Sequence, residues 1–123
     1  MSRINGLEEQ LKDEKARLER RDTILRLSKN SDFRKVFVEG FFRDDCARFA
    51  MESEDPALTT MQQADALNIA QAAGHVKRFL NAQIIMGDMA ERKLVEIEQA
   101  IEEERVLEQD GVQPDPEGYE EID

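Results

Sequence analysis

Few side chains in this 123-residue chain could do chemistry, and their spacing forms no catalytic or metal-binding pattern. His75 is the only histidine, and no cysteine or second histidine stands near it to complete a metal site. Cys46 is the only cysteine, so an internal disulfide is impossible, and we interpret it as a small buried side chain. We therefore predict no catalytic residue, no metal ligand and no cofactor.

Carboxylates are abundant, and the densest run is EIEQAIEEER at 96–105. Catalysis by paired carboxylates needs a pocket that moves their pKa values apart, and one exposed helix face does not provide such a pocket. The segment GFFRDD at 40–45 has a single glycine and cannot form a Gly-rich phosphate loop. The sequence therefore indicates a protein that is not an enzyme.

Charge is distributed unevenly along the chain. Residues 1–48 carry 12 Lys or Arg and 10 Asp or Glu, residues 49–123 carry 5 and 18, and the net charge is −11. Nucleic acid is not expected as a partner, because a polyanion needs a cationic surface. The chain has no secretory signal, and its apolar runs are shorter than the roughly 20 residues that span a membrane. We expect an acidic arm that aids solubility or binds a basic partner, formed by Glu102, Glu103, Glu104 and Asp110.

Apolar spacing predicts three helices, at about 3–28, 32–53 and 57–108. In the first helix, one seam position is apolar throughout, whereas the second is apolar only at Leu7 and polar at Glu14, Arg21 and Ser28. Because only one of its two seam positions is apolar throughout, this helix should need a partner helix to be stable. In the first helix, the apolar seam position holds Ile4, Leu11, Leu18 and Leu25. The third helix has a sustained seam that consists of Ile69, Ala73, Val76, Leu80, Gln83, Gly87, Ala90, Leu94, Ile97 and Ile101.

The helix lengths favour an elongated antiparallel hairpin or coiled coil. The first two helices hold about 48 residues, or about 72 Å of helix, and the third is equally long. The first helix would face 87–108 and the second would face 61–85; a bundle with the first helix folded back is the alternative. We divide the chain into an N-terminal charged coiled-coil helix (1–29), a hairpin core (30–109) and a disordered acidic tail (110–123).

Five of the six phenylalanines lie between residues 33 and 49. At 100° per residue, one stripe of the second helix should pack on the small residues at 70–74, with Gly40 and Gly74 allowing close approach. That core stripe comprises Phe33, Val36, Phe37, Gly40, Phe41, Ala47 and Met51.

A second apolar set points away from this stripe. Val38, Phe42 and Phe49 project to its opposite side, and Leu67, Ile85 and Met89 point away from the seam of the third helix. A helix that is apolar on two faces should be covered on both. The cover is the first helix folded back, a second copy or a different protein, and we predict these six residues as a protein interface.

The order of motifs resembles a group of small helical proteins of tailed bacteriophages. The resemblance covers about residues 24–94 and includes RLSKNSDFRKVFVEGFFRDDCARF followed by the helix containing FLNAQIIMG. It implies a structural or head-assembly role and carries over no catalytic residue. The matching positions are Leu27, Asn30, Asp32, Phe33, Gly40, Phe41, Arg48, Phe79, Leu80, Met86 and Gly87.

These observations predict a non-enzymatic virion or assembly protein, such as a scaffold or a head- or portal-associated module. We expect a homo-oligomer, contacts with other virion proteins, or both, in the host cytoplasm during assembly and possibly in the particle. One alternative is a small acidic inhibitor that imitates nucleic-acid charge on a host protein. Another is a protein–DNA linker that uses the basic segment around Arg20 and Arg21.

Overall fold

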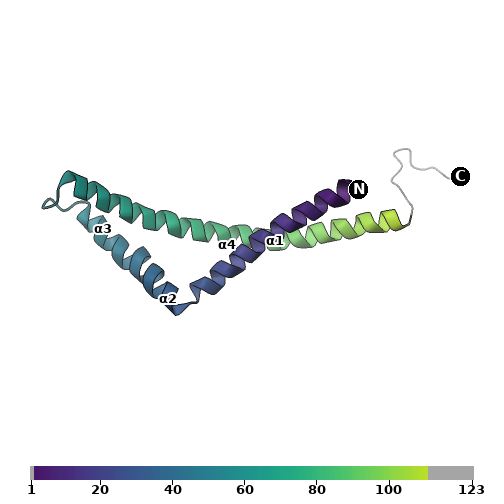
Figure 1. The fold of residues 1–123 in the computed structure, drawn as a ribbon, viewed down its shortest axis with the longest axis horizontal. Coiled ribbons are helices and arrows are strands. Elements are labelled where there is room, and N and C mark those ends of the chain that lie inside the picture. The colour runs from purple at the N-terminus through teal and green to yellow at the C-terminus, as the bar shows by residue number, and fades with distance from the viewer. Residues whose placement is uncertain (1, 111–123) are drawn as a thin grey trace.

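The computed structural model describes residues 2–110, which are helical apart from two short connections (Figure 1). The segments α2, η1 and α3 follow one another without a break and together form the predicted second helix. The described residues contain no strand, so the prediction of an all-α chain is confirmed. The predicted disordered tail after residue 110 lies outside the described residues. The elements are α1 (Ser2–Ser28), α2 (Ser31–Phe33), the π-helix η1 (Arg34–Asp45), α3 (Cys46–Glu52) and α4 (Thr60–Gln109).

Short polar side chains begin the two later helical segments. The Asn30 side chain accepts a hydrogen bond from the Phe33 N–H at 2.9 Å and caps α2. Thr59 and Gln62 form a reciprocal capping box at the start of α4. In the loop before it, Asp55 accepts a hydrogen bond from the Ala57 N–H at 2.9 Å. The third helix, expected from about 57, begins at Thr60, about one turn later.

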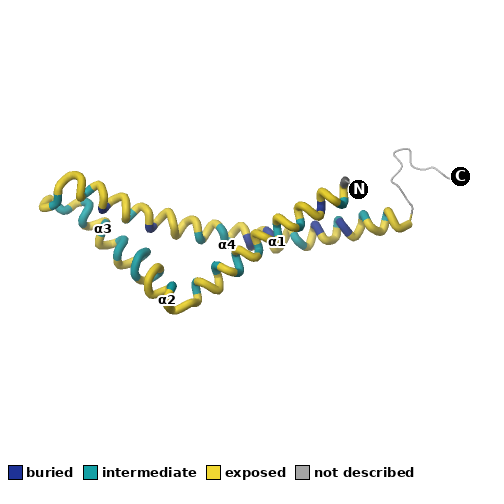
Figure 2. The backbone as a smooth tube through the Cα atoms, in the orientation of Figure 1, coloured by how far each residue is buried: buried dark blue, intermediate teal, exposed yellow. Residues whose placement is uncertain are grey.

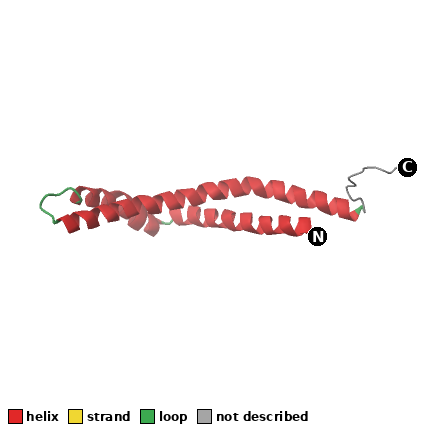
Figure 3. Cartoon of the chain, turned by 90° about the horizontal axis from the view of Figure 1, so that it is seen from above, coloured by secondary structure: helices red, strands yellow, loops and turns green. Residues whose placement is uncertain are grey.

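The helices form an elongated antiparallel hairpin (Figures 1 and 3). α1 runs against the C-terminal half of α4, where Arg3 Nε lies 3.0 Å from Glu104 Oε2. α3 packs against the N-terminal part of α4, where Cys46 Sγ lies 3.5 Å from the Ala70 carbonyl oxygen. The predicted hairpin is confirmed, with α1 continuing the first arm rather than folding back over it.

The first arm leaves α4 between these two contacts. It bends at 29–30, and α2 lies at the vertex of an open triangle whose long side is α4 (Figure 1). η1 then leads the chain back toward α4, which α3 meets directly. We call α1 with residues 87–109 of α4 the distal arm, and α2 and η1 with residues 69–86 of α4 the waist.

Most of the buried apolar residues lie in the distal arm (Figure 2). Leu7, Ile97 and Ile101 form one cluster, against which Leu11 and Ala100 pack. On the α3 side of the hairpin, Ala66 and Ala73 are the buried apolar residues of α4. The division at residue 29 stays a prediction, but the main cluster joins the predicted N-terminal segment to the predicted hairpin core.

The predicted seams point inward as expected. Every seam residue of α4 is buried or half-buried except Ile69 and Val76, which are each 38% exposed. In α1, the polar seam positions also face the interface, since the side chains of Glu14 and Arg21 are each only 13% exposed. Leu25 is 38% exposed because α1 has begun to leave α4 at that point. Heptad spacing therefore determines which way a side chain points, and the path of the partner helix determines how far that side chain is buried.

The aromatic segment packs differently from the prediction. In η1 the backbone bonds join residues five apart, as in the bond that the Cys46 N–H donates to the Phe41 carbonyl. Because a π-turn contains more residues than an α-turn, faces calculated at 100° per residue are misplaced. Four of the seven predicted core residues are exposed: Ala47, Val36 at 61%, Phe37 at 40% and Met51 at 77%. The residues predicted to point away are half-buried: Val38, Phe42 and Phe49.

The phenylalanine rings contact one another along α2 and η1. The Phe37 ring stacks on Phe33 with centroids 5.1 Å apart, and it meets Phe41 edge-on at 6.4 Å. The predicted close approach of Gly40 to Gly74 is wrong. A Cβ on Gly40 would meet its own helix, 3.0 Å from the Lys35 carbonyl oxygen, and a Cβ on Gly74 would meet nothing within 4 Å.

Candidate partner-binding surface

α4 carries a long surface without formal charge at pH 7. We call it the uncharged face. Between residues 68 and 89 the charged residues of α4 are Lys77, Arg78 and Asp88. Lys77 and Asp88 lie on other sides of the helix, and Arg78 lies at the edge of this face, with Nη1 3.2 Å from His75 Nδ1. This stretch of 22 residues is about 33 Å long, in a chain with 37% charged residues. The uncharged face consists of Asn68, Ile69, Ala72, His75, Val76, Phe79, Ala82, Gln83, Met86 and Met89, which are exposed except for the half-buried Gln83.

Six residues of this face alternate by three and four positions, which is the spacing of a helix-packing seam. We call Ile69, Ala72, Val76, Phe79, Gln83 and Met86 the outer seam. Ile69, Val76 and Gln83 also belong to the inner seam that faces the rest of the hairpin. Phe79 is 53% exposed and Met86 is 40% exposed. α4 therefore has the broad apolar stripe of a bundle helix in the waist, and the hairpin covers only one edge of it.

The outer seam leads into a groove between α1 and α4. One hollow of about 290 Å³ is lined by α1 residues 13–20 together with Gln83 and Met86. A neighbouring hollow of about 240 Å³ adds Met89 and Lys93. Arg20 Nη1 lies 3.4 Å from Gln83 Oε1 across this groove. The full lining is Asp13, Glu14, Ala16, Arg17, Arg20, Gln83, Met86, Met89 and Lys93.

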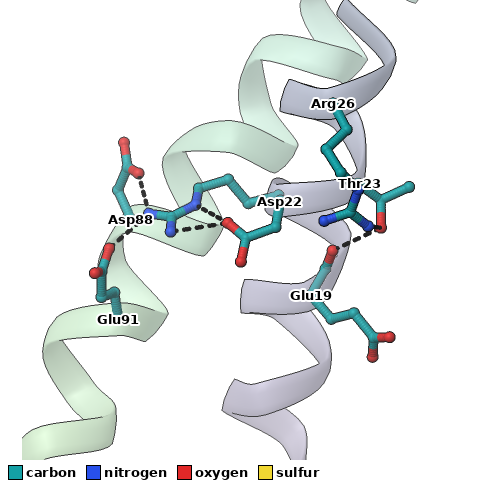
Figure 4. A network of polar contacts seen from close by, with 7 residues as sticks. Glu19, Asp22, Thr23, Arg26, Asp88 and Glu91 are labelled. Carbon is teal, nitrogen blue, oxygen red and sulfur yellow. Dashed lines mark hydrogen bonds and ion pairs between the residues drawn. The ribbon is translucent and has the colours of Figure 1, made fainter.

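Arg21 marks the place where the distal arm ends and the waist begins. Its Nη1 donates to Asp88 Oδ1 and Glu91 Oε1, each at 2.7 Å, and its Nε and Nη2 donate to Asp22 Oδ1 at 3.1 and 3.0 Å. Figure 4 shows Asp22, Asp88 and Glu91 gathered around this guanidinium. The hydrogen bonds that Arg21 donates to Glu91, Asp88 and Asp22 raise its pKa above the usual value. Arg21 thus joins α1 to α4 through two carboxylates of α4, and Asp22 of its own helix holds the guanidinium in place.

Gly87 makes room for this arginine. A Cβ at position 87 would overlap the Arg21 side chain, with Cγ at 2.8 Å and Cδ at 2.9 Å. Glycine is therefore required for α1 and α4 to approach each other here. The predicted heptad placed Arg21 and Gly87 on facing seams, but it did not indicate that one fits against the other.

The structure divides the six predicted interface residues into two groups. The three on the second helical segment are half-buried; the Phe42 ring lies 5.8 Å from Phe41, and the Arg48 guanidinium stands 4.2 Å over Phe49. Arg48 also pairs with Glu52 at 3.2 Å. The assignment of faces is wrong on this helix, and binding by Val38, Phe42 and Phe49 stays a prediction.

The three predicted interface residues on α4 are exposed, as expected: Leu67 at 44%, Ile85 at 58% and Met89 at 45%. Only Met89 belongs to the uncharged face. Leu67 and Ile85 lie outside the outer seam. The helix neighbours of Ile85 are Asn81 and Asp88 on one side and Ala82 and Met89 on the other, so Ile85 borders the edge of the uncharged face. They do not form one surface with Phe79 and Met86.

The predicted acidic arm is partly engaged within the chain. Glu104 binds Arg3 of α1, and its side chain is only 25% exposed. Glu102 and Glu103 are exposed and line a shallow surface hollow with Val106 and Leu107. These two glutamates, with the exposed Asp110, are the part of the arm that faces solvent.

The candidate chemical residues are not brought together. His75 is exposed, and its Nδ1 lies 3.2 Å from Arg78 Nη1. Cys46 is half-buried against Ala70 of α4, as a small packing residue would be. Within residues 2–110, no three His, Cys, Asp or Glu side chains gather in a geometry that could hold a metal ion.

None of the helices in the described part of the chain is long and apolar enough to cross a membrane. Comparison with models of known protein families, with curated proteins and with solved structures finds no match.

The outer seam is the surface that the sequence interpretation missed. The apolar spacing of the outer seam is visible in the sequence. The heptad pattern assigns Ile69, Val76 and Gln83 to the inner seam, and Phe79 and Met86 appear only among the positions of the phage resemblance. A second heptad reading of 69–86 would have joined the two sets. The sequence does not show that this surface is exposed. Its exposure follows from the separation of the two arms of the hairpin at the waist.

Proposed function

We propose that this chain is a non-enzymatic structural or assembly protein that acts through protein–protein contacts. The observation that carries the proposal is the uncharged face of α4, about 33 Å long, with Phe79 53% exposed at its centre. Aromatic and methionine side chains are enriched in protein interfaces, and charged residues are depleted from interface cores.

The rest of the hairpin serves to present this face. The distal arm fixes α4 through a buried apolar cluster and the Arg21 carboxylate contacts, whereas the waist leaves the same helix uncovered. A rigid helix with an exposed apolar stripe binds another helix more readily than it binds a small molecule.

The resemblance to small helical proteins of tailed bacteriophages supplies the biological setting of the proposal. In that setting the chain acts in the host cytoplasm during head assembly, as a scaffold or as a head- or portal-associated module, and it could remain in the particle. Its partners are other virion proteins, further copies of itself, or both.

Replacing Phe79 with aspartate tests the proposal in the phage that encodes the chain. We expect Phe79→Asp to lower the yield of complete particles or to remove the protein from gradient-purified assembly intermediates, as measured by mass spectrometry. Ile85→Asp is the matched control, because it adds the same charge to an equally exposed position of α4 outside the uncharged face. Normal particles from a phage that lacks the gene would contradict the proposal.

The acidic-inhibitor alternative makes the opposite prediction in the same assay. Under that alternative, neutralising Glu102 and Glu103 would abolish function and Phe79→Asp would leave it unchanged. That pair of results would overturn the assembly proposal.

A further inference from the structure

The outer seam is compatible with itself when two copies of α4 run antiparallel, and we propose that a second copy of this chain covers it in a two-fold dimer. This inference deepens the proposed function by naming the partner of the uncharged face.

The register of the dimer follows from the spacing of the seam. If residue 69 of one copy lies opposite residue 86 of the other, then 72 lies opposite 83 and 76 lies opposite 79. Residues 69, 76 and 83 occupy one seam position of the heptad, and residues 72, 79 and 86 occupy the other. Each layer then pairs one kind of position with the other kind, as antiparallel helix pairs require. The layers bring Ile69 to Met86 and Val76 to Phe79, so every large apolar residue of the outer seam meets another.

Charges at the two ends of the seam complement each other in this register. Continuing the same spacing outward adds Gln62 and Asp65 at one end, and Lys93 at the other, beyond Ala90, which α1 already covers. In the antiparallel pair, the end of one copy that carries Asp65 reaches the groove of the other. That groove is lined by Arg17, Arg20 and Lys93 and also by Asp13 and Glu14, so it carries one net positive charge. A parallel pair would place Asp65 opposite Asp65 and Lys93 opposite Lys93, which is unfavourable.

The shape of the hairpin leaves space for the second copy. The first arm stands away from α4, with the end of α1 and η1 as the far sides of the triangle and α2 at its vertex (Figure 1). The outer-seam residues Val76, Phe79 and Met86 are 38%, 53% and 40% exposed, so a neighbouring α4 can approach them without displacing a packed helix. Farther along, the start of the second α4 would lie at the groove beside Met86 and Met89, whose side chains are 40% and 45% exposed.

The first test measures the mass of the purified protein in solution over a range of concentrations by sedimentation equilibrium. We expect a dimer, and we expect Phe79→Asp to weaken it on the order of 100-fold, because each copy loses an apolar contact and gains a buried charge. Ile85→Asp should leave the dimer intact. A monomeric wild-type protein at high micromolar concentration, or equal effects of the two variants, would overturn the inference.

The second test fixes the direction of the pair with engineered cysteines in a Cys46→Ser background. A mixture of Ala72→Cys and Gln83→Cys chains should form a disulfide-linked heterodimer under mild oxidation. Ala72→Cys alone should not cross-link, since its two copies would be offset by about 16 Å along the helix. Efficient cross-linking of Ala72→Cys alone would indicate a parallel pair and contradict the proposed register.

The third test reverses the end charges. Asp65→Lys and Lys93→Asp should each weaken the dimer about two- to fivefold, and the double variant should recover the wild-type affinity. Weakening that is additive in the double variant would overturn the proposed pairing.

These measurements separate the dimer from the proposed function. A stable antiparallel dimer with normal particles in the absence of the gene would sustain the inference and reject the assembly role. A monomer that is still required for particle formation would do the reverse.

Discussion

The two halves of α4 have similar apolar spacing and very different burial. In the distal arm, Ala90 is fully buried and Ile101 is 5% exposed, because α1 follows the inner seam closely. In the waist, Val76 is 38% exposed and Phe79 is 53% exposed, although the helix is at least as apolar there. The difference comes from the path of the first arm, which turns away from α4 after α1.

The contrast shows how a long hairpin can provide stability in one region and a binding surface in another. The distal arm contains the apolar cluster and the Arg21 contacts, and both hold α1 in register. The waist has no comparable cluster among its described residues, and its aromatic rings contact each other along η1. Substitutions should therefore change the stability of the hairpin in the distal arm and its association in the waist.

Truncating a buried residue of the distal arm should have the largest effect on stability. We expect Ile101→Ala to lower the free energy of unfolding by about 2–4 kcal/mol, because it leaves a cavity beside Leu7 and Ile97. Ile85→Ala is the same substitution at a position that is 58% exposed, and it should change the free energy by less than about 0.5 kcal/mol. Urea unfolding followed by circular dichroism, at fixed protein concentration, checks both values. Equal losses would contradict the contrast between the regions.

The two glycines of α4 should respond in opposite directions to the same substitution. Gly87→Ala should destabilise the hairpin by about 1–2 kcal/mol, because the overlap of its Cβ with Arg21 outweighs the gain in helix propensity. Gly74→Ala should stabilise it by up to about 1 kcal/mol, since nothing lies within 4 Å of the new methyl group. Thermal unfolding of the two variants measures the difference. Stabilisation by Gly87→Ala would show that α1 does not approach α4 as closely as described.

Replacing Arg21, where the distal arm meets the waist, should destabilise the hairpin more than replacing Arg43 of η1. Arg21 is 13% exposed and contacts three carboxylates, whereas Arg43 is 68% exposed and contacts Asp44. We expect Arg21→Met to lower the unfolding midpoint, by less than Gly87→Ala does, and Arg43→Met to leave it almost unchanged. Because the Asp88 and Glu91 side chains are 50% and 62% exposed, salt should screen part of this interaction, and the effect of Arg21→Met should shrink between about 0.05 and about 1 M NaCl. A larger effect of Arg43→Met would reverse the expected order.

Much of the architecture could be predicted from the sequence, because it depends on periodic spacing. The inner seam of α4 and the polar seam positions of α1 were correctly oriented by their heptad positions alone. Asn30 and Thr59 have the short polar side chains that favour helix starts, and both act as caps. The antiparallel pairing followed from the lengths of the helices.

The candidate surface was harder to predict, for two physical reasons. First, the π-helical turns of η1 shift the faces of the aromatic segment, and α-helical spacing therefore placed Val36 and Phe37 in the core. The sequence contains only a weak sign of these π-helical turns. That sign is the glycine at position 40, where a Cβ would lie 3.0 Å from the Lys35 carbonyl oxygen. Second, the exposure of Phe79 depends on where the first arm leaves α4, and that path is a tertiary property that spacing within one helix does not encode.

The smallest expected effect concerns the exposed ion pair of η1. Arg43 Nε donates to Asp44 Oδ1 at 2.9 Å, and this hydrogen bond lowers the pKa of Asp44. A carboxylate with a lowered pKa stabilises the fold above the unfolded value of about 3.9, and this contribution is lost as the pH falls through the folded value. Asp44→Asn should therefore lower the unfolding midpoint slightly at pH 7 and have no effect well below pH 3.9. In an Arg43→Met background the pH 7 effect should disappear; if it persists there, Asp44 contributes to the waist by some route other than this ion pair.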